Sequence, residues 1–288
     1  MKNIFNKAIA VITIGWCVTS CSTEETEVLS DIIINNDPSL NERVTLKDEE
    51  IDVISSDNGR IQRDFTLTLV AELTPPSIDG KVLQATSMAR RKDFLAVSYN
   101  FAGQTYAGAI DLVNKNLELK SQILFNDADI NEIAFSGNRV YFVGGTSSSD
   151  RPAFVERINF DLESESFIDD RSKREEVGSF TANSVLTFSS KVFLTSGNDA
   201  ASGGGIYQLN KGLNRLNFQE IQDVRWVTPW KNSVYTVSGN PAKVQQYNKD
   251  DLSLEFEFEH QALNEEESKM TIDVNKNLIF VAGGKQGL

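Results

Sequence analysis

Val140-Tyr141-Phe142-Val143-Gly144-Gly145 is an apolar run that ends in two glycines, and four similar runs occur elsewhere in the chain. The other four are Phe94-Leu95-Ala96-Val97-Ser98-Tyr99, Val192-Phe193-Leu194-Thr195-Ser196-Gly197, Val234-Tyr235-Thr236-Val237-Ser238-Gly239 and Leu278-Ile279-Phe280-Val281-Ala282-Gly283. The first residues of these runs lie 46, 52, 42 and 44 positions apart. Repeats with a period of about 20 to 50 residues are typical of solenoids and propellers.

A second element follows each of the first four runs and places Asp or Asn directly after an apolar residue, as in a strand that enters a turn. These elements are Ala109-Ile110-Asp111-Leu112, Arg157-Ile158-Asn159-Phe160, Gln208-Leu209-Asn210-Lys211 and Gln246-Tyr247-Asn248-Lys249. One more strand on each side completes the unit, for example Ile130 to Phe135 before it and Leu119 to Phe125 after it. Four strands in roughly 45 residues make one propeller blade. A β-sandwich also has many strands, but it gives no reason for five copies of one strand.

The sequence therefore predicts an all-β fold, a β-propeller of four-stranded blades, over residues 61–288. Because the fifth unit stops after its second strand, the prediction is an incomplete ring of four blades and a partial fifth, incomplete at its C-terminus. The alternating strand Phe65 to Val70 is expected to close the ring on the final blade. The alternative is a compact five-bladed ring in which residues 65–70 complete the last sheet.

Two segments resemble known propeller repeats. Leu278 to Leu288 resembles the central segment of LVIVD-type repeats, in which a hydrophobic strand and a Gly-containing turn precede a Gly-Leu pair. Val140 to Gly145, followed by Phe154 to Phe167, resembles a kelch unit with its double glycine. The other units have Ser-Gly or Ser-Tyr in place of Gly-Gly. Both resemblances imply the propeller fold and say almost nothing about function.

Residues 1–20 have the features of a lipoprotein signal peptide. Lys2 and Lys7 precede the apolar run 8–18, which is too short for a membrane-spanning helix of about 20 residues. The run ends in Val18-Thr19-Ser20-Cys21, which resembles the bacterial lipobox. That resemblance implies cleavage before Cys21 and a lipid anchor on this residue. The alternative is an ordinary secreted protein whose signal peptide contains a cysteine.

Residues 21–60 are predicted to form a lipidated acidic tether, extended by the mutual repulsion of its carboxylates. In lipoproteins a residue other than Asp after the Cys, here Ser22, is compatible with outer-membrane sorting. The acidic pair in Ser22-Thr23-Glu24-Glu25 resembles the export signal of surface lipoproteins in Bacteroidetes. These resemblances imply an outer-membrane lipoprotein that faces the periplasm or the cell surface. Ile32 to Ile34 and Ile51 to Ile54 are candidates for short strands that pack on the main domain.

Composition excludes several classes of function. The chain of 288 residues has 28 Lys and Arg against 41 Asp and Glu, a net charge of −13 that repels phosphate backbones, so no nucleic-acid partner is expected. One His and two Cys leave little for nucleophilic or transition-metal chemistry, and no cofactor is predicted. Asp127 to Asn131 begins like a calcium loop, but Glu132 and Asn138 stand where the EF-hand needs Gly and Glu. No metal site is predicted.

Basic and aromatic side chains remain as candidate ligand contacts. Arg90 and Arg91 belong to a basic cluster, and Arg225 lies close in sequence to Trp226 and Trp230. Trp and Arg are enriched in binding hot spots. Trp226 is expected to point inward between blades, which leaves Trp230, Arg225, Arg90 and Arg91 as candidates for ligand binding and no candidate catalytic residue.

Three functions are compatible with the sequence. The first is a cell-envelope lipoprotein whose propeller is a non-catalytic binding module for an envelope protein or glycan. The alternative is an envelope polysaccharide lyase or glycoside hydrolase on a propeller scaffold, an analogy based on the fold alone. A purely structural assembly component is the third.

Overall fold

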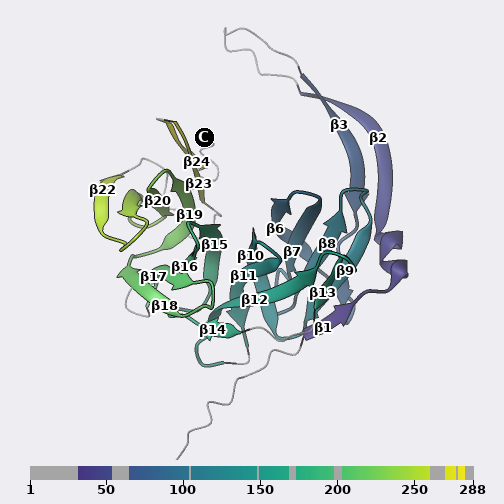
Figure 1. The fold of residues 1–288 in the computed structure, drawn as a ribbon, viewed down its shortest axis with the longest axis horizontal. Coiled ribbons are helices and arrows are strands. Elements are labelled where there is room, and N and C mark those ends of the chain that lie inside the picture. The colour runs from purple at the N-terminus through teal and green to yellow at the C-terminus, as the bar shows by residue number, and fades with distance from the viewer. Residues whose placement is uncertain are drawn as a thin grey trace, which may run out of the picture.

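The computed structural model describes residues 32–53, 65–103, 105–147, 149–168, 173–197, 203–259, 270–276 and 278–282. Four antiparallel sheets follow one another along this part of the chain (Figure 1). The first contains β6 (Gln84–Arg91), β7 (Phe94–Asn100), β8 (Gly108–Asn114) and β9 (Leu119–Phe125). The second contains β10 (Ala128–Ser136), β11 (Arg139–Thr146), β12 (Ala153–Asp161) and β13 (Ser166–Ile168), with β14 (Arg174–Glu176) also paired to β12.

The third and fourth sheets repeat the same order. The third contains β15 (Ala182–Phe188), β16 (Lys191–Ser196), β17 (Gly205–Asn210) and β18 (Arg215–Glu220). The fourth contains β19 (Val224–Trp230), β20 (Ser233–Ser238), β21 (Lys243–Asn248) and β22 (Leu254–Glu259). The hairpin of β23 (Thr271–Asn275) and β24 (Leu278–Ala282) follows, and a small hairpin of β4 (Ser77–Ile78) and β5 (Lys81–Val82) precedes the first sheet.

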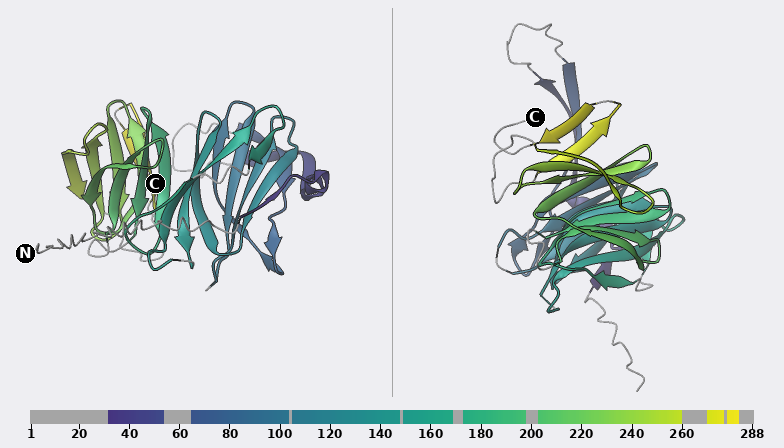
Figure 2. Two further views of the ribbon diagram at one scale, coloured as in Figure 1. Left: turned by 60° about the horizontal axis from the view of Figure 1, so that its bottom comes forward. Right: turned by 90° about the vertical axis from the view of Figure 1, so that its left-hand side faces the viewer.

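The sheets stand side by side in an arc, with the first strand of each sheet innermost (Figures 1 and 2). The inner strands β6, β10, β15, β19 and β23 contact one another in that order. Among the described strands, β24 pairs only with β23, and no pairing closes a ring. The predicted all-β architecture of four-stranded antiparallel sheets, resembling a propeller, is therefore confirmed.

Apolar side chains fill the space between neighbouring sheets. Phe125 of the first sheet and Phe142 of the second are both buried, with ring centroids 5.3 Å apart. Similar clusters lie between the second and third sheets and between the third and fourth. Val237 of the fourth sheet packs with Ile272 of β23 in the last cluster. Each sheet has two apolar faces, so neighbouring sheets bury one another and supply the main stabilising term.

Polar bonds at equivalent positions fix the inner strands to one another. The first strand of each four-stranded sheet contains a β-bulge, and in the first three sheets the extra residue donates to a backbone carbonyl of the next sheet. The bonds run from Thr86 to Ile130 O (2.7 Å), from Asn131 to Ala182 O (2.9 Å) and from Asn183 to Val224 O (3.0 Å). Bulges redirect side chains, and here they direct polar groups across the sheet interfaces.

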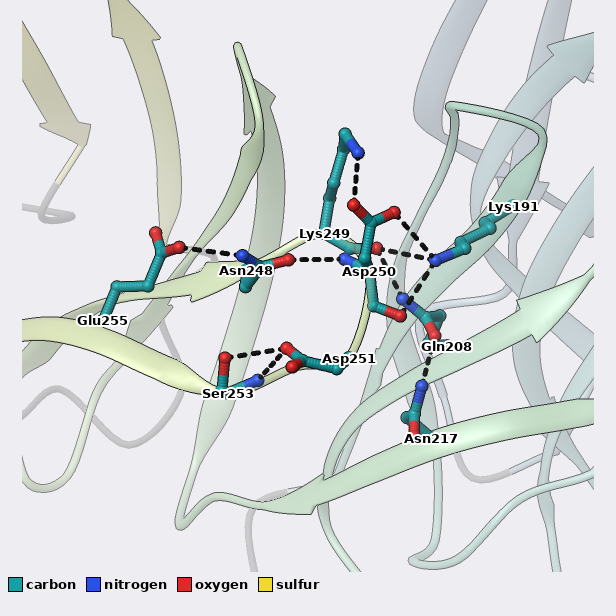
Figure 3. Close-up of polar contacts among 9 residues, drawn as sticks. All are labelled: Lys191, Gln208, Asn217, Asn248, Lys249, Asp250, Asp251, Ser253 and Glu255. Carbon is teal, nitrogen blue, oxygen red and sulfur yellow. Dashed lines mark hydrogen bonds and ion pairs between the residues drawn. The ribbon is translucent and has the colours of Figure 1, made fainter.

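The outer turns add a second set of contacts between sheets (Figure 3). In the turn from β21 to β22, Asn248 Oδ1 accepts the Asp250 amide at 2.8 Å, which is an Asx turn. Lys191 of the third sheet donates its Nζ to the carbonyl oxygens of Lys249 (3.1 Å) and Asp250 (3.0 Å). Gln208 donates to the same Lys249 carbonyl at 2.6 Å. The turn of one sheet is thereby fixed to the preceding sheet.

The predicted second element is wrong in the first unit and, by two residues, in the second, where β12 continues past Asn159 to Asp161. Asp111 lies in the middle of β8, fully buried, and does not start a turn. Asn114 does so three residues later, where its Oδ1 accepts the Asn116 and Glu118 amides at 3.0 and 3.1 Å. Asp111 instead binds Arg43, which donates Nη2 and Nη1 to the two carboxylate oxygens at 2.6 and 3.0 Å. A buried carboxylate needs such a partner, and the local sequence pattern does not reveal one 68 residues away.

The predicted closing strand is also wrong. β3 (Phe65–Leu73) pairs antiparallel with β2 (Val44–Val53), and the two form a long hairpin that extends away from the sheets (Figure 1). A partner close in sequence costs less loop-closure entropy than the final blade would. Arg43 anchors the base of this hairpin, because its Nε also donates to Thr74 O at 2.9 Å.

Part of the expected tether is folded. Within 21–60, the structure describes 32–53, which form β1 (Ile32–Asn35), a 3-10 helix η1 (Pro38–Arg43) and β2. β1 pairs with β9 and adds a fifth strand to the outer edge of the first sheet, with Ile32 opposite Phe125. The candidate strand at Ile32 to Ile34 is thus observed, and apolar burial and backbone pairing outweigh carboxylate repulsion there. No helix in the described part of the chain is long and apolar enough to cross a membrane.

Candidate functional site

A pocket of about 420 Å³ lies between the fourth sheet and the β23–β24 hairpin. We call it the Trp230 pocket. Its lining residues are Trp230, Lys231, Asn232, Ser233, Tyr235, Gln246, Val274, Lys276 and Ile279. The volume falls within the range of small-molecule sites, about 300 to 1,000 Å³.

The turn between β19 and β20 forms one wall of the pocket. Trp230 is the last residue of β19 and pairs with Ser233 across a two-residue turn, in which Lys231 has a positive φ of 52°. The Lys231 Nζ lies 5.6 Å from the centroid of the Trp230 ring, within the range of a cation–π contact. The ring is half-buried against the cluster that contains Val274, so one part of the indole is fixed by packing.

The opposite wall comes from the β23–β24 hairpin. Val274 and Ile279 contribute apolar surface, and Lys276 contributes an exposed ammonium group from the turn between the two strands. Lys276 has a positive φ of 56° and occupies the turn position that Lys231 occupies one sheet earlier. Because β19 and β23 are neighbouring inner strands, the two lysines stand at the same end of the arc's inner wall.

Neutral polar groups line the floor. Gln246 Nε2 donates to Ser233 Oγ at 3.0 Å, and both donate to Glu255 Oε2, at 2.7 and 2.8 Å respectively. Asn248 Nδ2 donates to the other oxygen of Glu255 at 3.1 Å. These bonds hold the floor side chains in one orientation. Burial, and to a lesser degree the charge of Glu255, raise the pKa of Tyr235, which keeps its hydroxyl protonated as a hydrogen-bond donor.

The four residues predicted as ligand contacts do not form one site in the structure. Trp230 lines the pocket, but Arg225 lies near the opposite end of β19, about 17 Å away at about 3.4 Å per residue. Arg225 Nη2 binds Asp223 Oδ2 at 2.8 Å, and its guanidinium covers Gly239, where an added Cβ would lie 2.4 Å from it. Arg225 is therefore engaged within its own sheet and does not belong to the Trp230 pocket.

Arg90 and Arg91 end β6 in the first sheet, and neither lines the Trp230 pocket. Arg90 is exposed, and the Arg91 guanidinium lies 5.5 Å from the centroid of the Phe160 ring in the second sheet. Trp226 is half-buried and packs in the same cluster as Val237, as predicted. Cys21 lies outside the described residues.

Sequence reasoning missed Lys231, Lys276, Tyr235 and Gln246. A signal for the lysines was present, because Lys92, Lys231 and Lys276 each follow the last residue of a first strand. Lys92, like the other two, has a positive φ, here 46°. No cluster of three or more His, Cys, Asp or Glu side chains suited to a metal occurs among the residues that the structure describes.

Comparisons with known proteins identify a fold and no family. No protein-family model matches the chain, and no curated protein matches its sequence. A complex of KlAtg21 with the coiled coil of AgAtg16 is similar in structure, with a TM-score of 0.51 and 13% identity over 83% of this chain and 77% of that one.

Two further structures are similar at lower scores. A putative 6-phosphogluconolactonase from Bacteroides uniformis has a TM-score of 0.46 and 14% identity over 69% of this chain, which spans 63% of that protein's length. A subtype N10 neuraminidase-like protein has a TM-score of 0.41 and 10% identity over 63% of this chain and 61% of that one. The likeness to the KlAtg21 complex, at 13% identity, concerns the fold alone, and it agrees with the all-β arrangement of successive sheets described above.

Proposed function

We propose that this chain is a cell-envelope lipoprotein whose propeller is a non-catalytic binding module, with the Trp230 pocket as its ligand site. One observation carries the choice of site: the pocket combines a half-buried indole, two ammonium groups and fixed neutral polar groups. Aromatic faces and a few convergent polar groups are typical of binding sites. No Asp or Glu lines the pocket among the described residues, whereas glycosidic cleavage generally uses two carboxyl groups.

We expect the whole protein, purified in detergent, to cleave none of a panel of glycosides, polyuronates, esters and peptides above the buffer rate. Among the described lining residues there is no pair of carboxyl groups for glycosidic hydrolysis, and burial raises the pKa of Tyr235, which disfavours the phenolate that a lyase would use as its base. Product release would be followed by reducing-sugar assay and, for a lyase, by ultraviolet absorbance of the unsaturated product. Saturable turnover that is lost in a point variant would favour the polysaccharide lyase or glycoside hydrolase alternative.

The lipid anchor is part of the proposal and rests on the lipobox resemblance at Cys21. If Cys21 carries the lipid, the ten residues 22–31 reach at most about 35 Å. These residues lead to Ile32 at the start of β1, which pairs with Phe125 at the end of β9. This is the end of the sheets at which the inner strands begin. Trp230 ends an inner strand, so the pocket and the start of β1 lie at opposite ends of the inner strands.

We expect Cys21→Ala to leave the precursor without lipid and to release the protein from the membrane fraction, because acyl chains supply the anchoring energy. Cys17→Ala is the matched control, since Cys17 lies within the predicted signal peptide, and this variant should stay membrane-bound. Fractionation followed by immunoblotting measures both. A Cys21→Ala protein that resists salt and carbonate washes would show that the lipobox assignment is wrong.

We also propose that the four sheets with their common strand order are propeller blades of the LVIVD or kelch type, and that β23 and β24 are the inner half of a fifth blade. The contact of β23 with β19 supports this, because it repeats the contact of β19 with β15.

A further inference from the structure

We propose that the Trp230 pocket takes an acidic saccharide, with a sugar ring against Trp230 and a carboxylate paired with Lys231 or Lys276. This inference rests on the proposed binding function and names the ligand class of that site. Charge is the first reason. The chain has a net charge of −13, yet the charged side chains that line the pocket among the described residues are both lysines.

The two lysines occupy matched positions. Each follows a neighbouring inner strand, at the same position of a two-residue turn, with φ values of 52° and 56°. Both are exposed, and neither has an ion pair with a carboxylate among the described residues. The nearby carboxylate of Glu255 is held by three donors, Ser233, Gln246 and Asn248. The Lys276 ammonium is therefore available to an anionic ligand, and the Lys231 ammonium must exchange its contact with the Trp230 ring for the ligand carboxylate when a sugar packs there.

Ring and hydroxyl chemistry is the second reason. Trp230 offers an aromatic surface of the kind on which the C–H face of a pyranose packs, and Tyr235 adds a phenol beside it. Asn232, Ser233 and Gln246 offer amide and hydroxyl groups that match sugar hydroxyls. An acidic peptide side chain would use the lysines but would leave the indole surface of Trp230 without a ring to pack on it. The combination favours a uronate-bearing glycan over an acidic peptide.

Calorimetric titration of the whole protein with tetragalacturonate tests the inference. Carboxyl-reduced tetragalactose and tetraglutamate are the comparison ligands. We expect Lys231→Asn and Lys276→Asn each to weaken tetragalacturonate binding about five- to tenfold, since each removes one charge-assisted contact. Asn tolerates a positive φ, so these changes remove charge without straining the turn. Trp230→Ala should weaken binding by at least about tenfold.

Lys92→Asn is the matched control, because Lys92 occupies the equivalent turn of the first sheet and lies outside the pocket. It should bind as the unchanged protein does. Equal affinity for the neutral tetramer, with loss only in Trp230→Ala, would overturn the acidic ligand and leave the binding function standing. Preference for tetraglutamate, or no binding of tetragalacturonate at millimolar concentration, would overturn the inference, whereas enzymatic turnover alone would overturn the proposed function.

Discussion

Arg43→Ala should lower the free energy of unfolding by about 3 kcal/mol, because it leaves the Asp111 carboxylate buried without its charged partner. Asp111 is fully buried, and Arg43 is its charged partner, donating from both terminal nitrogens. Gln122 also donates, through Nε2 at 2.9 Å from Oδ1, and the Tyr99 hydroxyl lies beside the same carboxylate. Loss of Arg43 also removes the bond to Thr74 O at the base of the β2–β3 hairpin.

Urea unfolding followed by circular dichroism measures the effect. Lys47→Ala is the matched control, because Lys47 lies in the same hairpin and its ion pairs in the described part of the chain, with Glu49 and Glu72, involve exposed carboxylates. Such pairs contribute about 0 to 1 kcal/mol. A second variant, Arg43→Ala with Asp111→Asn, should recover part of the loss, since the neutral amide costs less to bury. If Arg43→Ala is no more destabilising than Lys47→Ala, the buried ion pair does not anchor this hairpin.

Gly144→Ala should destabilise the protein by about 3 kcal/mol, at the upper end of the usual cost of overpacking. A Cβ at Gly144 would lie 1.7 Å from the backbone oxygen of Asp129 in the neighbouring strand β10. The Asp129 oxygen is part of the β10 backbone beside a β-bulge, so the clash can be removed only if the strand itself moves. The steric conflict is the physical reason for the first glycine in the pair at 144 and 145.

Gly145→Ala is the internal control. There the nearest atom to an added Cβ is the ring edge of Tyr106, at 3.1 Å, which belongs to a side chain and can move by a few tenths of an ångström. We expect Gly145→Ala to cost about 1 kcal/mol or less. The two variants would be compared by urea unfolding and by the yield of soluble protein. Equal stability of the two would mean that β11 does not approach β10 as closely as described.

The sequence was sufficient to predict the strands, because period-two apolar runs and turn residues are local features. The five apolar runs were aligned one residue out of register in the first and fifth units relative to the others. Phe94 and Leu278, which begin those two runs, pair with the last residues of the preceding strands. The residue that makes this pairing in the second unit is Arg139, one position before the start of its run at Val140. Matching apolar runs by composition cannot detect this, since a slip of one residue changes the face of every side chain but leaves the run apolar.

Contacts between residues that are far apart in the sequence could not be predicted from local sequence patterns. Asp111 looked like a turn residue because its partner, Arg43, lies in a segment that resembled a linker. The pocket joins the turn at Lys231 to the turn at Lys276, which belong to different sheets. Trp230 was identified because a tryptophan beside a turn is conspicuous in the sequence itself. Arg225 was grouped with it wrongly, because residues five apart in a strand lie at different ends of a blade.

Hydrogen exchange of the whole protein, with and without soluble envelope polysaccharide, tests most directly the claim that the Trp230 pocket is the ligand site. Peptides that contain the β19–β20 turn and the β23–β24 turn should exchange more slowly when ligand is present, because a bound saccharide covers both turns. The turn at Lys92 and the region of Arg225 and Gly239 should exchange as before. Protection confined to those two control regions, or no protection anywhere, would contradict the account.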